Sequence, residues 1–273
     1  MALQTEMIPS ENRPDDDRFA SLPNHELLIK PPFTMVITGS IGSGKSSLLW
    51  SMLNPKNGFY KKYFDYILIF NGSLDSNKVW SEASTEDNEI EVENKWDNDK
   101  FQQWLTRLEK DQMRLEEEGK QLQRVAVIFD DAVSKGISNR FKVNALDDAV
   151  QRCRHLNLSI FIASQCYRQL NRSQRSLNTL AFIITKVNYM DLEAIAEEHA
   201  GLIKPKTFIE MYRKVMKHKS KKIPYPYLVV NYQKEPKDRY WMTFNYPIHI
   251  TEDGDESEDE PDMENEVEEE TEE

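Results

Sequence analysis

The chain has 273 residues, 39% of them hydrophobic and 30% charged, a composition typical of a soluble globular protein with polar extensions. No apolar run approaches the roughly 20 residues that span a bilayer, and the N-terminus lacks the pattern of a signal peptide, so we expect no membrane contact. Cys153 and Cys166 are too few for a disulfide framework or a zinc site, which favours buried thiols in a reducing intracellular compartment.

The two ends of the chain differ in composition from its middle. Residues 1–30 form a polar arm, which we expect to be ordered near Leu27-Leu28-Ile29. Residues 251–273 contain fifteen Asp or Glu and no Lys or Arg, which predicts a disordered acidic tail. Removing those fifteen negative charges from the net charge of −12 leaves +3 for residues 1–250. A mildly basic body with an acidic tail indicates a nucleic-acid partner, and we assign the folded domain to residues 31–250.

Residues 33–53 predict a strand, a glycine-rich loop and a helix in succession. The apolar run at 33–38 is typical of a buried strand, and the pattern at 47–53, ended by Asn54-Pro55, is typical of a helix. The loop between them has the G-x-x-x-x-G-K-[ST] pattern of a phosphate-binding loop. We predict that a nucleotide contacts Gly39, Ser40, Ile41, Gly42, Ser43, Gly44, Lys45, Ser46 and Ser47.

The residue types of this loop are those that phosphate binding needs. Glycines let the backbone N–H groups turn toward an anion, and the helix N-terminus adds partial positive charge. Lys45 is expected to reach the β- and γ-phosphates of ATP, and the Ser46 hydroxyl to bind Mg²⁺. The alternative is a glycine turn that contains a lysine by chance. It is disfavoured because only 9 of the 273 residues are glycine.

A strand at 65–70 and a long helix are expected next. Asn71-Gly72 end the strand, and we interpret residues 73–99 as a long, irregular surface loop with Trp80 and Trp96 as anchors. An apolar stripe at helical spacing then predicts a helix that packs on the core rather than a ligand site. Its members are Phe101, Trp104, Leu105, Leu108 and Leu115.

Residues 125–131 have the pattern of a Walker B strand, with five apolar residues before Asp130-Asp131. Such a strand buries its apolar run and carries a carboxylate at its C-terminal end, beside the phosphate loop. Asp130 is expected to hold Mg²⁺, mostly through water, and Asp131 to orient or deprotonate the attacking water. The alternative, a strand that ends in a solvated acidic turn, is disfavoured by the preceding phosphate loop.

Further elements follow in the second half of the chain. A helical pattern over 141–153 leads to Arg152 and Arg154 and to a fourth apolar strand at 158–165. Gln165 ends this strand and is expected at the same sheet edge as Asp130, where an amide can sense the γ-phosphate or the attacking water. A fifth strand at 180–185, a helix from Asn188 to Gly201 and a hairpin at 227–232 and 240–244 complete the prediction.

Two basic segments are candidates for contact with double-stranded DNA. The first is residues 168–175, which lie within a stretch free of acidic residues (151–190). The second is residues 204–222, which hold eight Lys or Arg against one Glu. Side chains there can pair with phosphates without reading bases. The alternative is a solvated basic face. The candidate contacts are Arg168, Arg172, Arg175, Lys214, Lys217 and Lys221.

Strands and helices alternate through residue 185, which predicts an α/β fold with a mainly parallel sheet and helices on both faces. One strand lies between the two Walker motifs in the sequence, and a polar-tipped strand follows the second motif. This order suits the RecA-like (additional-strand) P-loop NTPases, in which a further strand separates the two Walker strands in space. Ligands of such sheets bind at the carboxyl ends of the strands.

The segments ITGSIGSGKSS, VAVIFDDAV, RCRHLNLSIFIASQ and LAFIIT together resemble the viral genome-packaging ATPases of the FtsK–HerA superfamily. The likeness is to the poxvirus type, shared by large DNA viruses and virophages, and covers about residues 31–201. It implies a homo-oligomeric ring that hydrolyses ATP with Mg²⁺ to push double-stranded DNA into a preformed capsid. It also implies a capsid or portal-vertex protein as partner, and a location in the virion and the host-cell cytoplasm.

The resemblance also implies roles for single residues. The arginine before the fourth strand acts in the family as an arginine finger on a neighbouring subunit's ATP; Arg154 matches that place best and Arg152 next. The strand-end glutamine corresponds to Gln165. The superfamily commonly has Glu after the Walker B Asp, whereas this chain has Asp131, whose shorter carboxylate can still position water.

Three other functions share part of this pattern. A GTPase is suggested by residues 185–188, which faintly resemble the guanine-reading [NT]KxD motif, but Asn188 lacks the carboxylate that pairs with guanine. A DNA helicase or recombination ATPase of the same group would differ in separating strands. A non-catalytic virion or scaffold protein would retain a relict nucleotide site, and its ATPase activity would equal that of Lys45→Ala.

Overall fold

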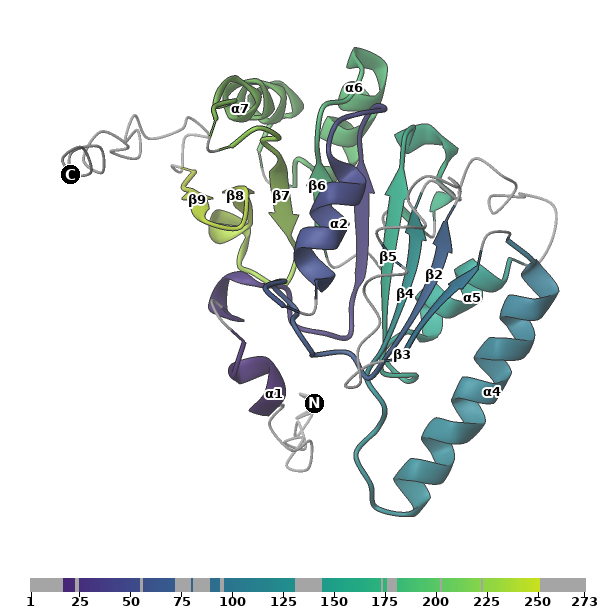
Figure 1. Ribbon diagram of the computed structural model, residues 1–273. Helices are drawn as coiled ribbons and strands as arrows, with labels where there is room; N and C mark the ends of the chain where they lie inside the picture. The colour runs from purple at the N-terminus through teal and green to yellow at the C-terminus, as the bar shows by residue number, and fades with distance from the viewer. Residues whose placement is uncertain are drawn as a thin grey trace, which may run out of the picture.

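The computed structural model describes residues 17–22, 25–54, 56–71, 80, 89–93, 96–130, 144–172, 174–175, 181–201, 203–221 and 223–250. In this part of the chain, nine strands form one sheet in the order β3-β2-β4-β5-β1-β6-β7-β8-β9 (Figure 1). The acidic tail at 251–273, the first sixteen residues of the predicted arm and Asp131 lie outside the described residues.

Six neighbouring strands are parallel, as the alternation of strands and helices predicts. All but the edge strand β3 are apolar runs buried almost throughout, as expected of strands covered on both faces. Their bounds are Thr34–Thr38 (β1), Tyr66–Asn71 (β2), Glu89–Glu93 (β3), Val125–Asp130 (β4), Leu158–Ser164 (β5) and Ala181–Ile184 (β6).

The strand order confirms the additional-strand arrangement. β5 lies between β1, which precedes the phosphate loop, and β4, which carries the Walker B pattern. The pairing aligns Thr38 with Ser164 and Asp130 with Ala163, so the ends of all three strands meet at one edge. The polar residues that follow these strands are therefore brought to the same edge of the sheet.

The remaining strands are antiparallel and extend the sheet beyond β6. β7 (Leu228–Asn231) pairs with β6, and β8 (Tyr240–Met242) pairs with β7, which confirms the predicted C-terminal hairpin. A further strand, β9 (Tyr246–Ile248), pairs with β8. β9 was not predicted from the sequence, because it has only three residues and one of them is a proline.

Helices cover both faces of the sheet (Figure 1). α2 packs with the N-terminal segment on one face, whereas α4, α5, α6 and α7 contribute to the hydrophobic cluster on the other. Strand residues alternate between the clusters; Val36 belongs to the second, and Met35 and Ile37 to the first. The helices are α1 (Asp17–Ala20), α2 (Lys45–Leu53), α4 (Asn98–Glu117), α5 (Ala145–Arg152), α6 (Tyr189–His199) and α7 (Pro205–Lys217), and the short 3₁₀ helices are His25–Leu27, Tyr167–Gln169 and Pro236–Asp238.

The predicted helical stripe of α4 is confirmed from Phe101 to Leu108, whereas Leu115 lies outside the hydrophobic clusters. Phe101, Leu105 and Leu108 are buried against the sheet, and the Asp97 side chain caps the helix by accepting from the N–H groups of Asp99 and Lys100. Asp97 thus satisfies two of the N–H groups that have no partner within the helix.

One prediction about regular structure is wrong. Residues 73–99 are not irregular throughout, because Glu89–Glu93 pairs as β3 with β2; its alternating charges suit an exposed edge strand. One helix was not predicted: the basic segment at 204–222 contains α7, which buries Phe208, Met211, Tyr212 and Val215. The anchoring role of Trp80 is confirmed, since its buried ring packs edge-on against Trp50.

The described part of the predicted N-terminal arm packs against the domain. Phe19, Leu22, Leu28 and Ile29 are buried in the same cluster as α2. Burial of these apolar side chains keeps the segment in place. No helix in the described residues is long and apolar enough to cross a membrane.

Candidate functional site

The phosphate loop connects β1 to α2 and depends on its glycines. Gly42 (φ +72°) and Gly44 (φ +91°) adopt the left-handed conformation that favours glycine. Gly39 is required for a different reason: a Cβ there would lie 1.7 Å from Oγ1 of Thr185. The loop therefore approaches the end of β6 so closely that a side chain at Gly39 has no space.

Hydrogen bonds fix this loop to the ends of two neighbouring strands. The Gly39 N–H donates to the carbonyl of Ser164, the last residue of β5 (3.1 Å), and the Ser40 N–H donates to the carbonyl of Lys186, two residues after β6 (2.7 Å). Thr185 Oγ1 donates to the Thr38 carbonyl (3.0 Å), so the Ser43 hydroxyl, 2.8 Å from Thr185 Oγ1, donates to it. The loop is thus held in shape by the parallel sheet.

Lys45 is almost fully buried and curves back over its own loop. Its Nζ donates to the carbonyls of Gly39 (2.9 Å) and Ser40 (3.2 Å), and the side chain is 5% exposed. A charged ammonium in this position needs an anion or several acceptors. The ammonium therefore already lies over the loop, where the anticipated phosphates would bind.

Ser46 and Asp130 meet at the carboxyl ends of β1 and β4. The Ser46 hydroxyl donates to Oδ1 of Asp130 across 3.0 Å, and Asp130 is 1% exposed. A hydroxyl oxygen beside a carboxylate suits Mg²⁺, which prefers oxygen ligands and commonly takes only one or two from the protein. The predicted proximity of the two Walker motifs is confirmed.

Gln165 follows β5 at the same edge and is exposed. Because Ala163 pairs with Asp130, Gln165 lies two residues beyond the level of the carboxylate. The expectation that Gln165 lies at the same sheet edge as Asp130 is therefore confirmed. Its predicted partner in water activation, Asp131, lies outside the described residues.

The two candidate finger arginines lie at the opposite edge, before the amino end of β5. Arg152 forms ion pairs with Glu109 of α4 and Asp148 of α5, and the hydrogen bond to Glu109 raises the pKa of Arg152. Arg154 is exposed and forms no ion pair with any described residue. Of the two guanidinium groups, that of Arg154 is the more accessible from outside the molecule.

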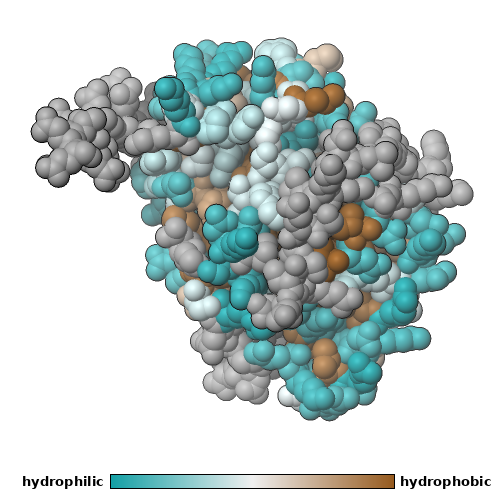
Figure 2. Space-filling view, in the orientation of Figure 1, coloured by the Kyte–Doolittle hydropathy of each residue, from teal (hydrophilic) through white to brown (hydrophobic). Residues whose placement is uncertain are grey.

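The basic residues predicted to contact DNA divide into two groups. Arg175 is largely covered: it pairs with Glu198, and its guanidinium lies 5.0 Å from the centre of the Tyr167 ring. The other five, Arg168, Arg172, Lys214, Lys217 and Lys221, are exposed. Figure 2 shows a mainly hydrophilic surface over α7. The interpretation as a DNA contact is therefore weakest for Arg175.

The segment that resembles a guanine-reading motif is engaged in the fold. The Asn188 side chain accepts from the Asp191 N–H (2.8 Å) and caps α6, as the sequence indicates, and Gly201 (φ +63°) follows the helix. The Lys186 carbonyl accepts from both the N–H and the hydroxyl of Ser40. These contacts give residues 185–188 a structural role beside the loop.

The sequence reading did not identify Thr185 and Tyr225 as neighbours of the loop. Thr185 binds Ser43 across 142 residues of sequence, and the Tyr225 ring lies against Gly44. The only sequence signal for Thr185 is that it follows a predicted strand, as Gln165 does. Nothing in the local sequence of Tyr225 indicates this contact.

The strand order, the glycine loop and the paired Ser46 and Asp130 define a P-loop NTPase fold of the RecA-like, additional-strand group. Residues 21–235 match the Poxvirus A32 protein family, and the chain belongs to that family. The resemblance found in the sequence motifs is thereby confirmed at the level of the family.

Two sets of known proteins are similar to this chain. DNA packaging protein OPG160 of Variola virus is 30% identical over 152 residues, which are 53% of this chain and 50% of that protein. The Vaccinia virus (strain Western Reserve) protein of the same name is 30% identical over 154 residues, 54% of this chain and 51% of that protein. The matched region thus spans about half the length of these relatives.

Among solved structures, B204, the DNA-packaging ATPase from Sulfolobus Turreted Icosahedral Virus, is similar with a TM-score of 0.54 at 17% identity. The match covers 74% of this chain and 94% of B204. The genome packaging NTPase B204 from Sulfolobus turreted icosahedral virus 2, in complex with AMP, is similar with a TM-score of 0.52 at 17% identity. This match covers 76% of this chain and 100% of that one. At this level of identity the likeness establishes the fold.

Proposed function

We propose that this protein hydrolyses ATP and uses the free energy to move double-stranded DNA into a viral capsid. The observation that carries the proposal is the contact of Ser46 with Asp130 beside a phosphate loop whose glycines and lysine are in place. Membership of the A32 family, whose relatives are named DNA packaging proteins, supports DNA as the polymer that is moved.

Binding of the triphosphate rests on residues of the loop. The N–H groups at the start of α2 and the Lys45 ammonium provide the positive charge, and Lys45 exchanges its two carbonyl acceptors for phosphate oxygens. Ser46 and Asp130 would hold Mg²⁺, which supplies charge neutralisation on the phosphate oxygens. In our proposal, the Ser46 hydroxyl turns from Asp130 toward the metal.

Hydrolysis needs a positioned water and a stabilised transition state. We assign Gln165 to the γ-phosphate or the water, and Asp131 to orientation or deprotonation of that water. Arg154 of one subunit would stabilise the charge on the ATP of the next subunit in a homo-oligomeric ring, with Arg152 as the second candidate. The exposure of Arg154 at the edge opposite its own loop supports action on a neighbour.

A direct hydrogen-bond path joins the nucleotide site to the basic helix. Tyr212 of α7 donates to the Thr185 carbonyl (3.1 Å) and accepts from the Val187 N–H (3.0 Å), while the Thr185 hydroxyl accepts from Ser43 of the loop. We assign Lys214, Lys217 and Lys221, with Arg168 and Arg172, to phosphates of duplex DNA. This path supports coupling between ATP and DNA.

The remaining parts of the proposal follow from the family resemblance. The protein would bind to a capsid or portal-vertex protein. It would act in the virion and in the host-cell cytoplasm where virions assemble. The helicase alternative uses the same ATP chemistry and differs only in the reaction on DNA, so the test must separate the two.

Triplex displacement tests translocation along duplex DNA. We expect ATP-dependent release of the third strand by the wild-type protein and none by Lys45→Ala. A forked substrate distinguishes the helicase alternative. Strand separation at the fork without triplex release would overturn the packaging proposal, and ATP turnover equal to that of Lys45→Ala would favour the non-catalytic alternative.

A further inference from the structure

A cavity of about 350 Å³ lies beside the phosphate loop, on the side away from Asp130. Its size is within the range of small-molecule sites. One wall is formed by the loop and α2, and the other by residues before β7 and around β8 and β9. The lining residues used below are Gly44, Ser47, Phe59, Tyr225, Asn245 and Tyr246.

The sheet order places this cavity where the nucleoside of a bound ATP must go. β4, which carries Asp130, lies on one side of β1, and β7, β8 and β9 lie on the other side. If the γ-phosphate and Mg²⁺ are near Asp130, the α-phosphate and the sugar leave the loop toward β7 to β9. Ser47, the residue after the predicted metal ligand Ser46, is part of the cavity lining.

Tyr225 presents an aromatic ring at the mouth of this cavity. It is 49% exposed, although its ring lies so close to the loop that a Cβ on Gly44 would be 2.8 Å from its Cγ. Pro224 and Pro226 flank it, and their fixed φ angles limit the freedom of the segment. An exposed ring on a stiff segment can stack on a base with little loss of conformational entropy.

The rest of the cavity combines aromatic packing with the exposed amide of Asn245. The Phe244 ring packs edge-on against both Phe59 and Tyr227, which supports the wall from behind. Asn245 is exposed at the cavity, and its side-chain amide offers both a donor and an acceptor. A planar heterocycle with donors and acceptors on its edge matches this lining.

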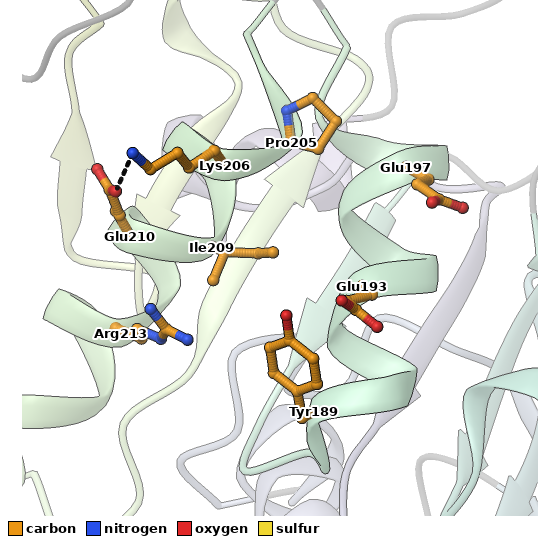
Figure 3. A pocket seen from close by; sticks show the side chains of 8 residues that line it. All are labelled: Tyr189, Glu193, Glu197, Pro205, Lys206, Ile209, Glu210 and Arg213. Atoms are coloured by element: carbon orange, nitrogen blue, oxygen red, sulfur yellow. Dashed lines mark ion pairs between the residues drawn. The ribbon is translucent and has the colours of Figure 1, made fainter.

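A second cavity, of about 330 Å³, lies between α6 and α7 and does not suit a nucleotide (Figure 3). Three carboxylates line it, from Glu193, Glu197 and Glu210, and two cations, Lys206 and Arg213. Lys206 already pairs with Glu210. Tyr189 lines this cavity and is 58% exposed, so it provides a matched control for Tyr225.

We propose that the cavity beside Gly44 is the subsite for the purine base of ATP, with Tyr225 as the stacking platform and Asn245 as the polar contact to the base edge. This inference rests on the proposed binding of ATP to the loop. The base contact belongs to the antiparallel part of the sheet, whereas the phosphate contacts belong to the parallel part.

Binding of two ligands separates the base from the phosphates. The non-hydrolysable analogue AMPPNP contains the base, and inorganic tripolyphosphate does not. We expect Tyr225→Ala to weaken AMPPNP binding roughly 10-fold or more, as for loss of a base–aromatic stack, without changing tripolyphosphate binding. Tyr225→Phe keeps the ring and is expected to bind both ligands like the wild type, as is Tyr189→Ala.

Each other outcome has a defined meaning. Unchanged AMPPNP binding by Tyr225→Ala, or an equal loss for both ligands, would overturn the base subsite while leaving the phosphate site in place. Failure of the wild-type protein to bind either ligand would instead overturn the proposed function itself. Asn245→Ala provides an independent second variant: loss of AMPPNP binding without loss of tripolyphosphate binding would support the subsite, and no loss would remove Asn245 from it.

Discussion

The two halves of the sheet are built differently and contribute differently to the site. In the parallel half, Asp130 ends β4, Ser164 ends β5 and Thr185 directly follows β6; all three are buried and hydrogen-bonded to the phosphate loop or to Ser46 after it. The antiparallel half offers exposed or partly exposed aromatic and amide groups, Tyr225, Tyr246 and Asn245. A rigid polar edge suits phosphates and a metal, whereas an open aromatic wall suits a base.

The parallel half of the sheet therefore serves phosphoryl transfer, whereas the rest of the molecule serves recognition of the base and of DNA. Phosphoryl transfer depends on charges held in fixed positions, which the buried edge of a parallel sheet provides. Recognition of the base and of DNA depends, in our account, on α7, on the segment after it and on strands β7 to β9. The following experiments alter one half at a time.

Substitution of Arg154 is expected to have the largest effect. We predict that Arg154→Ala lowers the rate of ATP hydrolysis by about 10³-fold or more, because an arginine finger contributes 10³–10⁵. Mixing Arg154→Ala with Lys45→Ala is expected to restore part of the turnover, since each supplies what the other lacks. Arg152→Ala is the matched control, whose main loss should be in stability, through Glu109 and Asp148. If Arg152→Ala loses ATP hydrolysis and Arg154→Ala keeps it, Arg152 is the arginine finger and the assignment to Arg154 is wrong.

His199 lies at the junction of the two halves. Its ring stacks on Phe182 of β6 (4.1 Å) and contacts the hydroxyls of Tyr167 and Tyr232, the latter directly after β7. Burial, with a smaller contribution from Arg175, lowers the pKa of His199 to about 3. The folded protein therefore keeps it neutral, while the unfolded chain takes up a proton below its ordinary pKa of 6.5.

This difference in proton uptake sets the direction of the pH dependence of stability. The contribution of His199 to the free energy of unfolding is fully present above pH 6.5. It decreases as the pH falls toward 3, by about 2 kcal/mol at pH 5. Urea unfolding at pH 7 and pH 5 measures the change, and His199→Gln should remove most of it. The same loss of stability between pH 7 and pH 5 in His199→Gln would contradict the assignment of this pH dependence to His199.

The basic helix offers a smaller effect that is specific to DNA. Lys217→Ala with Lys221→Ala is predicted to lower the slope of log Kd against log salt by about 2, one unit per lost phosphate contact. Lys110→Ala, an exposed lysine on α4, is the control and should leave the slope unchanged. Equal slopes for all these proteins would place the DNA on another surface.

Gly44 of the phosphate loop belongs to the parallel half and contacts Tyr225, which precedes β7 of the antiparallel half. Both Gly44→Ala and Gly119→Ala force a left-handed residue to carry a Cβ, which costs about 1–2 kcal/mol of unfolding free energy. Only at Gly44 does the new Cβ meet Tyr225; at Gly119 there is no atom within 4 Å. We therefore expect calorimetry to show reduced AMPPNP affinity in Gly44→Ala and not in Gly119→Ala. Equal AMPPNP affinities of the two variants would show that Tyr225 can move away from the new Cβ without weakening nucleotide binding.

Sequence patterns predicted the parallel half well. Apolar runs with polar ends define β1, β2, β4 and β5 locally, and the glycine loop fixes where β1 ends, so the contact of Ser46 with Asp130 followed from topology alone. Edge strand β3 was missed because Glu alternates with Ile90 and Val92. The stripe of α7 was present at Phe208, Met211 and Tyr212 but was obscured by lysines.

The base side could not be predicted in the same way. Tyr225 reaches Gly44 from 181 residues further along the chain, through the pairing of β7 with β6. Such a contact depends on how far an antiparallel hairpin extends a parallel sheet, and no local pattern specifies that. The contact of Thr185 with Ser43 could not be predicted for the same reason, because it exists only where β6 lies next to β1.

Steady-state ATP hydrolysis with Mg²⁺, measured with and without duplex DNA, tests the central claim most directly. The account predicts turnover by the wild-type protein that DNA increases, and a loss of about 10²-fold or more in Lys45→Ala, because the ammonium that lies over the loop is removed. Wild-type turnover no higher than that of Lys45→Ala, in the presence and absence of DNA, would contradict it.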